Sequence, residues 1–363
     1  FLNFKVASGF DIYNDISVNK QLNGYFDNNY SQNIDYYKNF FISNQLTSDS
    51  LNLITFNNKI GIKGTLKNFN YNIYGNYRRV GFQYSTDSVS STIDRLSLGG
   101  KLNFSKKKNK ISTEIKIKST GDYSFTGFLE SKIFKIIYNS SLYEPEIIFR
   151  RYQGNHFRWN NNFKSSFVNV FDSRLLLNNE KFKVEPYAKL ISVNDFIYLS
   201  DLRTLQQFSE VILVNHFGVD FYLQLFNNSI NIENKYTYTI LSESSSGVVN
   251  IPKHLNYSRI YYSGKWFEKS VPVQFGVNMY YRSKYFGNAF EPVLQSFFVQ
   301  NSFPLDSYLM YNVFFNMQIS NLRIFLKMDH FSQFDKFDGY FVTPYYPGQK
   351  KVLDLGVRWY FFN

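Results

Sequence analysis

The sequence of 363 residues contains no cysteine. A chain without cysteine has no disulfide framework, no thiol nucleophile and no cysteine-ligated zinc or iron–sulfur centre. It also lacks the run of about 18–20 apolar residues that a membrane-spanning helix requires, because even the stretch 308–315 is interrupted by Asn312. The first residues show no basic and apolar secretory leader, which suggests a processed or truncated start. These absences exclude a helical membrane protein and redox chemistry at sulfur.

The composition is unusual for a cytosolic enzyme. Aromatic residues make up 20% of the chain, charged residues only 19%, and the mean hydropathy is −0.32. Apolar side chains must therefore be spread along the chain rather than gathered in a few segments. Lysine and arginine number 40 against 28 aspartate and glutamate residues, which gives a formal net charge of +12.

Alternation of apolar and polar residues predicts β-strands. In the clearest segment, Ile230, Ile232, Tyr236, Tyr238 and Ile240 share one parity, and the positions between them are mostly polar. A period of two is that of a strand with one apolar and one polar face. The same period occurs in six further segments, 60–66, 96–104, 111–118, 273–282, 322–329 and 353–361.

Short polar connectors alternate with long ones. The short ones are 67–68, 106–109, 178–181 and 227–228, and the long ones are 24–33, 85–91, 242–256 and 335–349. This pattern is typical of a membrane barrel with short periplasmic turns and longer extracellular loops. At about 20–25 residues per strand and connector, the sequence predicts an all-β, transmembrane antiparallel β-barrel of about 16 strands, within a range of about 14–18.

No linker divides the chain, so we expect residues 1–363 to form a single outer-membrane β-barrel domain. Residues before Ile60 alternate poorly, and segment 1–50 could instead be a pre-barrel segment, a plug or a partner-binding arm. A soluble β-sandwich would also alternate, but aromatic residues crowd near the strand ends, as at Trp359 and Phe361. Interfacial aromatic girdles need that placement, which favours the membrane barrel.

The C-terminal strand carries a signal of its own. Val357, Trp359 and Phe361 alternate up to the end of the chain, which looks like the terminal strand that barrel-assembly machinery recognises. A strand in this place has to pair laterally, and we expect the first strand to be its partner.

Several ordered motifs resemble the putative porin family of Bacteroidota outer membranes. They are His156 to Phe163, Tyr280-Tyr281-Arg282 with Tyr285, Ala289 to Pro292, Phe298 with Gln300, Phe303 to Asp306, the set Arg323, Phe325, Lys327 and His330, then Phe341 to Pro347, and Gly356 to Trp359. These matches lie in the C-terminal two-thirds of the chain, and residues 1–60 match poorly. The resemblance implies an antiparallel barrel of the outer membrane and passive transport.

Catalytic motifs are missing from the sequence. It contains no Gly-x-Ser-x-Gly elbow, no His-Glu-x-x-His pair, no phosphate loop and no dinucleotide fingerprint. The four histidines, His156, His216, His254 and His330, share no metal-ligand spacing, and we expect each to be a hydrogen-bonded interfacial or loop residue. A Ser/His/Asp site built from distant strands is not excluded by spacing, but nothing positive supports one. We therefore predict no enzyme, no cofactor and no metal.

The basic residues are dispersed, which argues against nucleic acid as a partner. The dense cluster of Lys106 to Lys108 with Lys110 falls in a predicted turn. If the polar strand faces enclose a lumen, the predicted pore-lining residues are Lys59, Lys63, Lys101, Lys116, Lys118, Lys235, Arg282, Arg323, Lys327, Arg358, Glu114, Glu233, Asp329 and Asp354. Ten cations against four acidic residues favour anions. The same charges could equally be paired and merely hydrate the interior.

The sequence thus predicts a porin-like channel in the cell outer membrane for passive diffusion of small hydrophilic solutes, with a bias toward anions. Expected partners are outer-membrane lipid and lipopolysaccharide, the barrel-assembly machinery and other outer-membrane proteins. The alternative is a non-conducting structural or accessory barrel subunit of an assembly, secretion or uptake complex. An energised receptor for large nutrients is disfavoured, because the chain is too short for about 22 strands and a plug.

Overall fold

The computed structural model describes residues 2–7, 9–28, 36–87, 90–268, 270–333 and 339–361. Nearly all regular structure is β-strand. The described exceptions are one helical turn, α2 (Ile147–Arg150), and two 3-10 turns, η1 (Glu243–Ser245) and η2 (Phe331–Gln333). In these ranges no helix has the length and apolar character that crossing a bilayer would demand.

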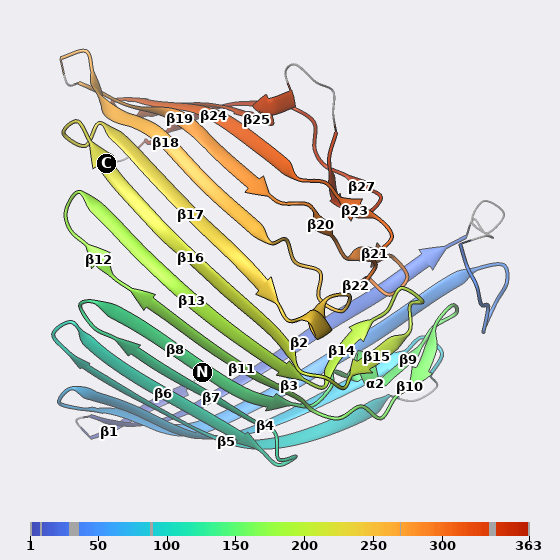
Figure 1. Cartoon of the computed structure of the whole chain (residues 1–363). Helices are drawn as coiled ribbons and strands as arrows, with labels where there is room; N and C mark the ends of the chain where they lie inside the picture. The colour runs from blue at the N-terminus through green and yellow to red at the C-terminus, as the bar shows by residue number, and fades with distance from the viewer. Residues whose placement is uncertain are drawn as a thin grey trace.

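One large antiparallel sheet makes up the wall of the molecule (Figure 1). Its strands are β1 (Leu2–Ala7), β2 (Phe10–Asp27), β3 (Thr47–Leu66), β4 (Phe69–Tyr84), β5 (Ser91–Lys106), β6 (Asn109–Lys118), β7 (Tyr123–Glu130), β8 (Phe134–Tyr143), β11 (Ser166–Leu175), β12 (Leu177–Asn178), β13 (Phe182–Asn194), β16 (Ile212–Leu225), β17 (Ile230–Leu241), β18 (His254–Trp266), β19 (Val271–Arg282), β24 (Tyr308–Ile319), β25 (Leu322–Asp329) and β28 (Val352–Trp359). The sheet is 17 strands wide, because β11 and β12 follow one another along the same edge of β13 and together count as one strand of the wall. The predicted all-β barrel class is confirmed.

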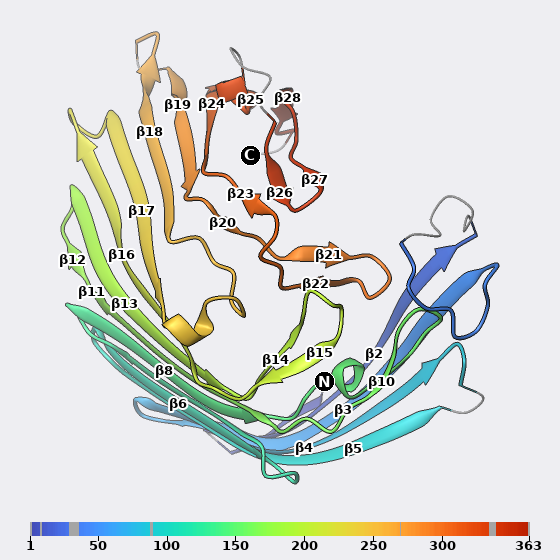
Figure 2. The same ribbon diagram turned by 45° about the vertical axis from the view of Figure 1, so that its right-hand side comes forward.

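Short hairpins lie on the concave side of the curved wall. Figure 2 shows β14, β15, β21, β22 and α2 inside the curve, well away from the convex surface. The hairpin strands are β9 (Arg151–Gln153) with β10 (Arg158–Asn160), β14 (Phe196–Leu199) with β15 (Leu205–Phe208), β20 (Tyr285–Phe286) with β23 (Pro304–Leu305), β21 (Ala289–Glu291) with β22 (Ser296–Phe298), and β26 (Phe341–Thr343) with β27 (Tyr346–Pro347). All of them belong to the long connections between wall strands.

The two ends of the wall differ in their connections. At one end, turns of two to four residues join β3 to β4, β5 to β6, β16 to β17 and β24 to β25. Asn227 and Asn228 adopt positive φ angles of 55° and 68°, a region that asparagine tolerates better than most residues. The predicted short connectors all lie at this end. Of the predicted long connectors, residues 29–33, 88–89 and 335–338 lie outside the described ranges.

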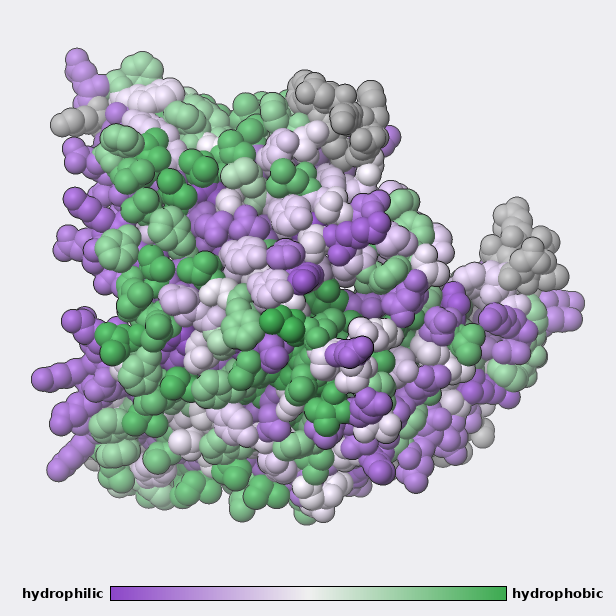
Figure 3. All heavy atoms as spheres, viewed as in Figure 1, coloured by the Kyte–Doolittle hydropathy of each residue, from purple (hydrophilic) through white to green (hydrophobic). Residues whose placement is uncertain are grey.

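The convex face is apolar and exposed, as alternation predicts. Leu96, Leu98, Ile115 and Ile117 on β5 and β6 expose between 45% and 64% of their surface. Figure 3 shows hydrophobic residues as a broad band across the strands, with hydrophilic side chains at the turn end. An apolar band of this extent on a soluble monomer would be rare, whereas hydrocarbon is its natural solvent.

Aromatic side chains gather near the turn end of this band. Trp266 lies within about 6 Å of the rings of Phe275 and Phe315, and Trp359 stacks on Phe361 at 5.5 Å. The first contacts join rings of β18, β19 and β24, and the second is a separate pair at the end of β28. The expected interfacial girdle is therefore present on this part of the wall.

The expectation that the last strand pairs with the first is wrong for the described residues. β1 pairs only with β2, and β28 pairs only with β25. Both edge strands run toward the turn end, since Ala7 is opposite Phe10 and Trp359 is opposite Leu322. A direct bond between them would be parallel, unlike every other pair in this wall. Antiparallel closure would need an odd number of strands between the two edges.

Most of segment 1–50 does not form a plug. Residues 2–7 and 10–27 are strands of the wall, and residues from Thr47 onward belong to β3. β2 pairs with β3 over its whole length, from Asp11 with Lys63 to Asp27 with Thr47. The poor alternation that suggested a separate segment comes from polar residues on both faces of β2. In the connection between β2 and β3, the described residues Asn39, Ile42 and Ser43 contact the inner residues Asn155 and His156.

A charged residue on the convex face should destabilise the barrel, whereas one on the concave face at the same height should not. Ile115 faces outward on β6, and its diagonal neighbour Thr126 on β7 faces inward opposite Glu114. Ile115→Arg should cost up to about 2–4 kcal/mol of unfolding free energy in lipid vesicles, because the guanidinium would enter hydrocarbon. Thr126→Arg should change it little. Urea titration of both variants checks this, and equal losses would contradict the assignment of the faces.

Candidate functional site

The strand registers place all fourteen predicted pore-lining residues on the concave face. Lys59, Asn76, Ser97 and Lys118 follow one another as direct partners across β3, β4, β5 and β6. Continuing the same partnership strand by strand reaches Arg358 on β28. The mainly apolar parity of the seven alternating segments therefore faces outward, and the mainly polar parity, which also contains Tyr280 and Phe325, faces the hollow of the sheet.

Some of the predicted residues meet, and others are far apart along the wall. Lys101 lies 3.4 Å from Glu114, and Lys327 lies 2.7 Å from Asp329. Arg323 is directly opposite Arg358. Lys118 on β6 lies 3.8 Å from Glu144, and Asp354 on β28 is directly opposite Lys327. The other residues are spread along the face: Lys59 and Lys63 on β3, Lys116 on β6, Glu233 and Lys235 on β17, and Arg282 on β19. About half of the predicted set thus has a charged partner close by.

Several charges of the concave face were missed by the sequence analysis. Arg78 and Arg95 are register partners on β4 and β5. Arg174 on β11 contacts Glu185 at 3.2 Å and also pairs with Asp220. The alternation of these strands carries the signal, but tyrosine on both faces of β4 obscures it.

A hollow of about 710 Å³ lies between the wall strands β2–β6 and the connection that carries α2. Its wall side is polar and basic, with Arg78, Arg95, Lys116 and Lys118. Its opposite side is formed by residues 144–150 and by the tip of the β21–β22 hairpin. Together with Arg150, five cationic residues line the hollow against two acidic ones, Glu144 and Glu146.

Glu144 holds the α2 connection against the wall. Arg95 donates to both of its carboxylate oxygens, at 2.9 and 2.7 Å, and Arg150 donates at 2.5 Å. The ammonium group of Lys118 lies 3.8 Å away. The hydrogen bonds from Arg95 lower the pKa of Glu144 to about 2, although burial opposes this shift. One carboxylate therefore neutralises part of the basic wall and anchors an inner segment to it.

Apolar side chains join the inner hairpins to the concave face of the wall at its loop end. Leu51 and Tyr84 of β3 and β4 pack in one buried cluster with Tyr152, Leu199 and Phe298 of the inner hairpins. On the opposite wall, Ile212 and Val214 pack against Val248. The concave face is therefore apolar toward the loop end and polar toward the turn end.

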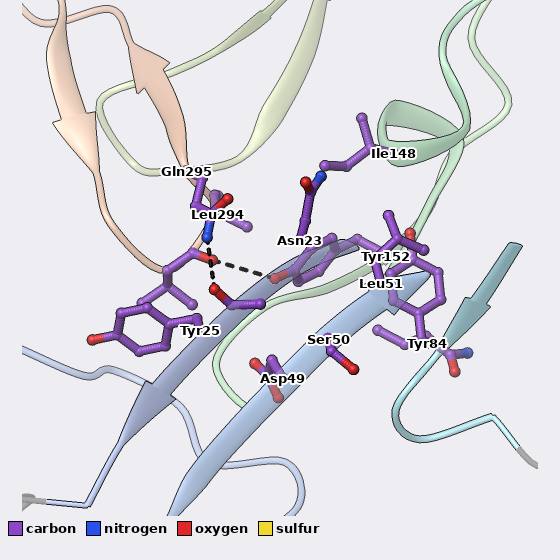
Figure 4. A pocket seen from close by; sticks show the side chains of 13 residues that line it. Asn23, Tyr25, Asp49, Ser50, Leu51, Tyr84, Ile148, Tyr152, Leu294 and Gln295 are labelled. Atoms are coloured by element: carbon purple, nitrogen blue, oxygen red, sulfur yellow. Dashed lines mark hydrogen bonds between the residues drawn. The ribbon is translucent and has the colours of Figure 1, made fainter. Parts of the chain in front are cut away.

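Hydrogen bonds connect the β21–β22 tip to the wall (Figure 4). Gln295 donates to the carbonyl of Gly24 on β2 at 2.7 Å, and the Tyr152 hydroxyl donates to the carbonyl of Val293 at 3.5 Å. Figure 4 shows these side chains converging with Asp49 and Leu51 of β3. The hairpins thus form a continuous inner layer rather than free loops.

The His156 motif has a structural role in this layer. The imidazole of His156 bonds to the Asn39 carbonyl at 2.8 Å and to the Thr47 hydroxyl at 2.6 Å. The amide of Asn155 holds Ile42 and Ser43. His216, His254 and His330 are also hydrogen-bonded. In the described ranges, no three His, Cys, Asp or Glu side chains lie together as a metal site would require.

Comparison with protein families identifies the chain. A family model described as putative porin matches residues 4–363. The chain belongs to the putative porin family. The match extends the resemblance from the C-terminal two-thirds to nearly the whole chain, including the N-terminal strands that looked divergent. No curated protein matches the chain.

Solved structures share the fold with this porin-family chain at 9–10% sequence identity. It is similar to the copper transporter OprC (9% identity, TM-score 0.69, covering 98% of this chain and 63% of that one). It is also similar to the FrpB iron transporter from Neisseria meningitidis in its apoprotein form (10% identity, TM-score 0.64, covering 98% of this chain and 62% of that one). A third similar structure is the pyoverdine outer membrane receptor FpvA from Pseudomonas aeruginosa PAO1 (9% identity, TM-score 0.60, covering 97% of this chain and 59% of that one). The chain thus spans about three fifths of the length of each of these proteins. Its family and its fold identify it as an outer-membrane β-barrel protein.

Removing the carboxylate of Glu144 should loosen the α2 connection. Glu144→Gln is expected to lower the unfolding free energy at pH 7 by about 1–2 kcal/mol, because Arg95 and Arg150 lose a half-exposed charged acceptor. Glu146→Gln is the matched control, since Glu146 forms no salt bridge within the described part of the chain. Urea unfolding followed by tryptophan fluorescence measures both.

The effect of Glu144 should depend on pH in one direction. Its pKa in the folded protein lies below the ordinary value of 4.5, so the pairing stabilises the fold above that pH and is lost as pH falls toward about 2. The difference between wild type and Glu144→Gln should therefore shrink between these two values. A difference that stays constant down to pH 2 would show that ionisation of Glu144 is not its cause.

Proposed function

We propose that the protein lets small hydrophilic solutes, with a preference for anions, diffuse down their gradients across the cell outer membrane. The observation that supports this most directly is the basic surface of the 710 Å³ hollow. Arg78 and Lys116 in this hollow have no carboxylate within 4.0 Å among the described side chains. A polar wall with excess positive charge concentrates anions and repels cations. Such a path needs no cofactor and no catalytic residue.

A filled, non-conducting accessory barrel is the second candidate. The inner layer supports it, because buried apolar contacts of Leu51, Tyr84 and Ile212 close the concave face toward the loop end. Solutes would then have to pass beside the hairpins rather than through a wide lumen. Stable copurification with a larger outer-membrane complex, together with absence of conductance, would favour this candidate.

Outer-membrane lipid, lipopolysaccharide and the barrel-assembly machinery are the partners that this function requires. The convex apolar band suits the lipid, and the exposed Trp359 and Phe361 suit recognition of the terminal strand. We include other outer-membrane proteins as partners only for the accessory candidate.

Planar-bilayer recording of the purified full-length protein tests the channel. Discrete conductance steps with a reversal potential favouring anions are expected. Arg78→Glu combined with Lys116→Glu should lower the anion-to-cation permeability ratio several-fold, because the basic wall then carries opposite charge. Lys107→Glu, in the turn between β5 and β6, is the control and should leave the ratio unchanged. No conductance at all would refute the channel.

The terminal strand signal can be tested in cells. Trp359→Ala combined with Phe361→Ala should reduce the amount of folded protein in the outer membrane, because the aromatic end of β28 would be lost. Trp266→Ala on β18 removes a girdle aromatic elsewhere and should have a much smaller effect. Heat-modifiable migration of membrane fractions measures folded protein, and equal effects of the two changes would contradict a specific signal.

A further inference from the structure

Two hollows of different chemistry share a boundary inside the wall. The first is the basic hollow of about 710 Å³ described above. The second has a volume of about 270 Å³ and lies among the inner hairpins. Ile148, Phe149, Leu294 and Ser296 line both hollows. The basic and the apolar hollow are therefore neighbours, separated by these shared side chains.

The basic hollow contains an unsatisfied polar group. Asn76 is only 7% exposed, and its side-chain oxygen has no hydrogen-bond partner in the described part of the chain. Its amide lies in the concave row between Lys59 and Ser97, and Arg78 is the next inward-facing residue on the same strand. Asn76 lines the hollow and its amide nitrogen is a donor, so it can donate to an anion held by Arg78.

The acidic groups around this position are already engaged or solvated. Glu144 accepts from Arg95 and Arg150, and Glu114 lies 3.4 Å from Lys101. Glu146 also lines the hollow, but its side chain is exposed. On β6, the inward-facing neighbours of Lys116 are Glu114, which is shared with Lys101, and Lys118. Arg78 and Lys116 therefore offer donors to an incoming anion with little competition from the protein's own carboxylates.

The second hollow is apolar and aromatic. Its lining includes residues of α2, β10, β14, β15 and β22, with Trp159, Phe196, Leu205, Val248 and Phe297 as the main apolar side chains. Trp159 donates its indole N–H to the carbonyl of Ile148 at 2.8 Å, so the ring presents carbon atoms to the cavity. A cavity with such walls favours an aromatic or alkyl group over an ion.

We propose that the two hollows together bind an organic monoanion with an apolar body. Its carboxylate contacts Arg78, Lys116 and Asn76, and its aromatic or alkyl part crosses the shared boundary into the apolar hollow. The proposal rests on the proposed transport role and narrows the solute to anions that also have an apolar body. Simple inorganic anions and neutral apolar compounds do not belong to this class.

Three probes separate the two halves of this site. 4-Phenylbutyrate carries both features, acetate carries only the carboxylate, and 4-phenylbutanol carries only the apolar body. Calorimetric titration of the full chain in lipid nanodiscs, with empty nanodiscs as reference, should show 4-phenylbutyrate binding about tenfold or more tightly than either other probe. Equal affinity for acetate would overturn the apolar half, and equal affinity for 4-phenylbutanol would overturn the basic half.

Variants locate the site in the fold. Arg78→Gln combined with Lys116→Gln should weaken 4-phenylbutyrate binding about tenfold or more, without affecting 4-phenylbutanol. Leu205→Trp, which adds volume to the apolar hollow, should weaken both of these probes. Lys106→Gln combined with Lys107→Gln removes two charges at the turn end of β5, outside both hollows, and is the matched control. Unchanged binding in the first two variants would overturn the assignment.

The binding test is independent of conduction. If bilayer recording shows no current and 4-phenylbutyrate still binds as described, the channel is refuted and the binding site stands. If current is recorded and the three probes bind equally, the site is refuted and the channel stands. Current block by 4-phenylbutyrate that is lost in the Arg78 and Lys116 double variant would support both.

Discussion

The constraint on which this structure depends is that no backbone polar group can remain unpaired in hydrocarbon. Wall strands between the two edges satisfy their N–H and C=O groups by pairing on both sides, whereas β1 and β28 each pair on one side among the described residues, and all described pairs of the wall are antiparallel. Once the backbone is paired in this way, side chains have only two directions, outward to lipid or inward to the hollow. The same constraint makes the two edges informative. β1 and β28 run in the same direction, so a barrel in which all neighbouring strands are antiparallel cannot join these two strands directly.

That constraint also explains how much of the fold the sequence predicts. On β17, the alternation of Ile230, Ile232 and Ile240 with polar neighbours fixes both the strand and its outward face, and the registers confirm it. The charged residues assigned inward from such segments lie on the concave face for the same reason. A period of two is a local property, and short segments are enough to read it.

The inner layer could not be predicted in this way. Ile212 and Val214 occupy inward positions but are apolar and buried, because Val248 from a distant connection packs on them. Alternation fails wherever a loop folds back on the wall, since both faces of the strand then meet apolar surroundings. The pairing of Glu144 with Arg95 joins residues 49 positions apart and leaves no local signal. Arg78 was missed for a related reason. Tyr74 and Tyr77 lie on opposite faces of β4, so the alternation of apolar and polar residues in this strand is not visible in the sequence.

The inner layer and the charge of the wall are physically coupled through Glu144. With the α2 connection in place, this carboxylate compensates Arg95 and Arg150 and leaves Arg78 and Lys116 to set the local field. If the connection moved away, Arg95 would lose Glu144 and Lys118 would keep only Asp122, so the wall would become more positive. In the channel proposed above, the position of this short segment would set both the width of the path and the number of cations that a solute meets. These two quantities decide which solutes pass a passive channel, so we expect selectivity to depend on how the connection is anchored as much as on the wall itself.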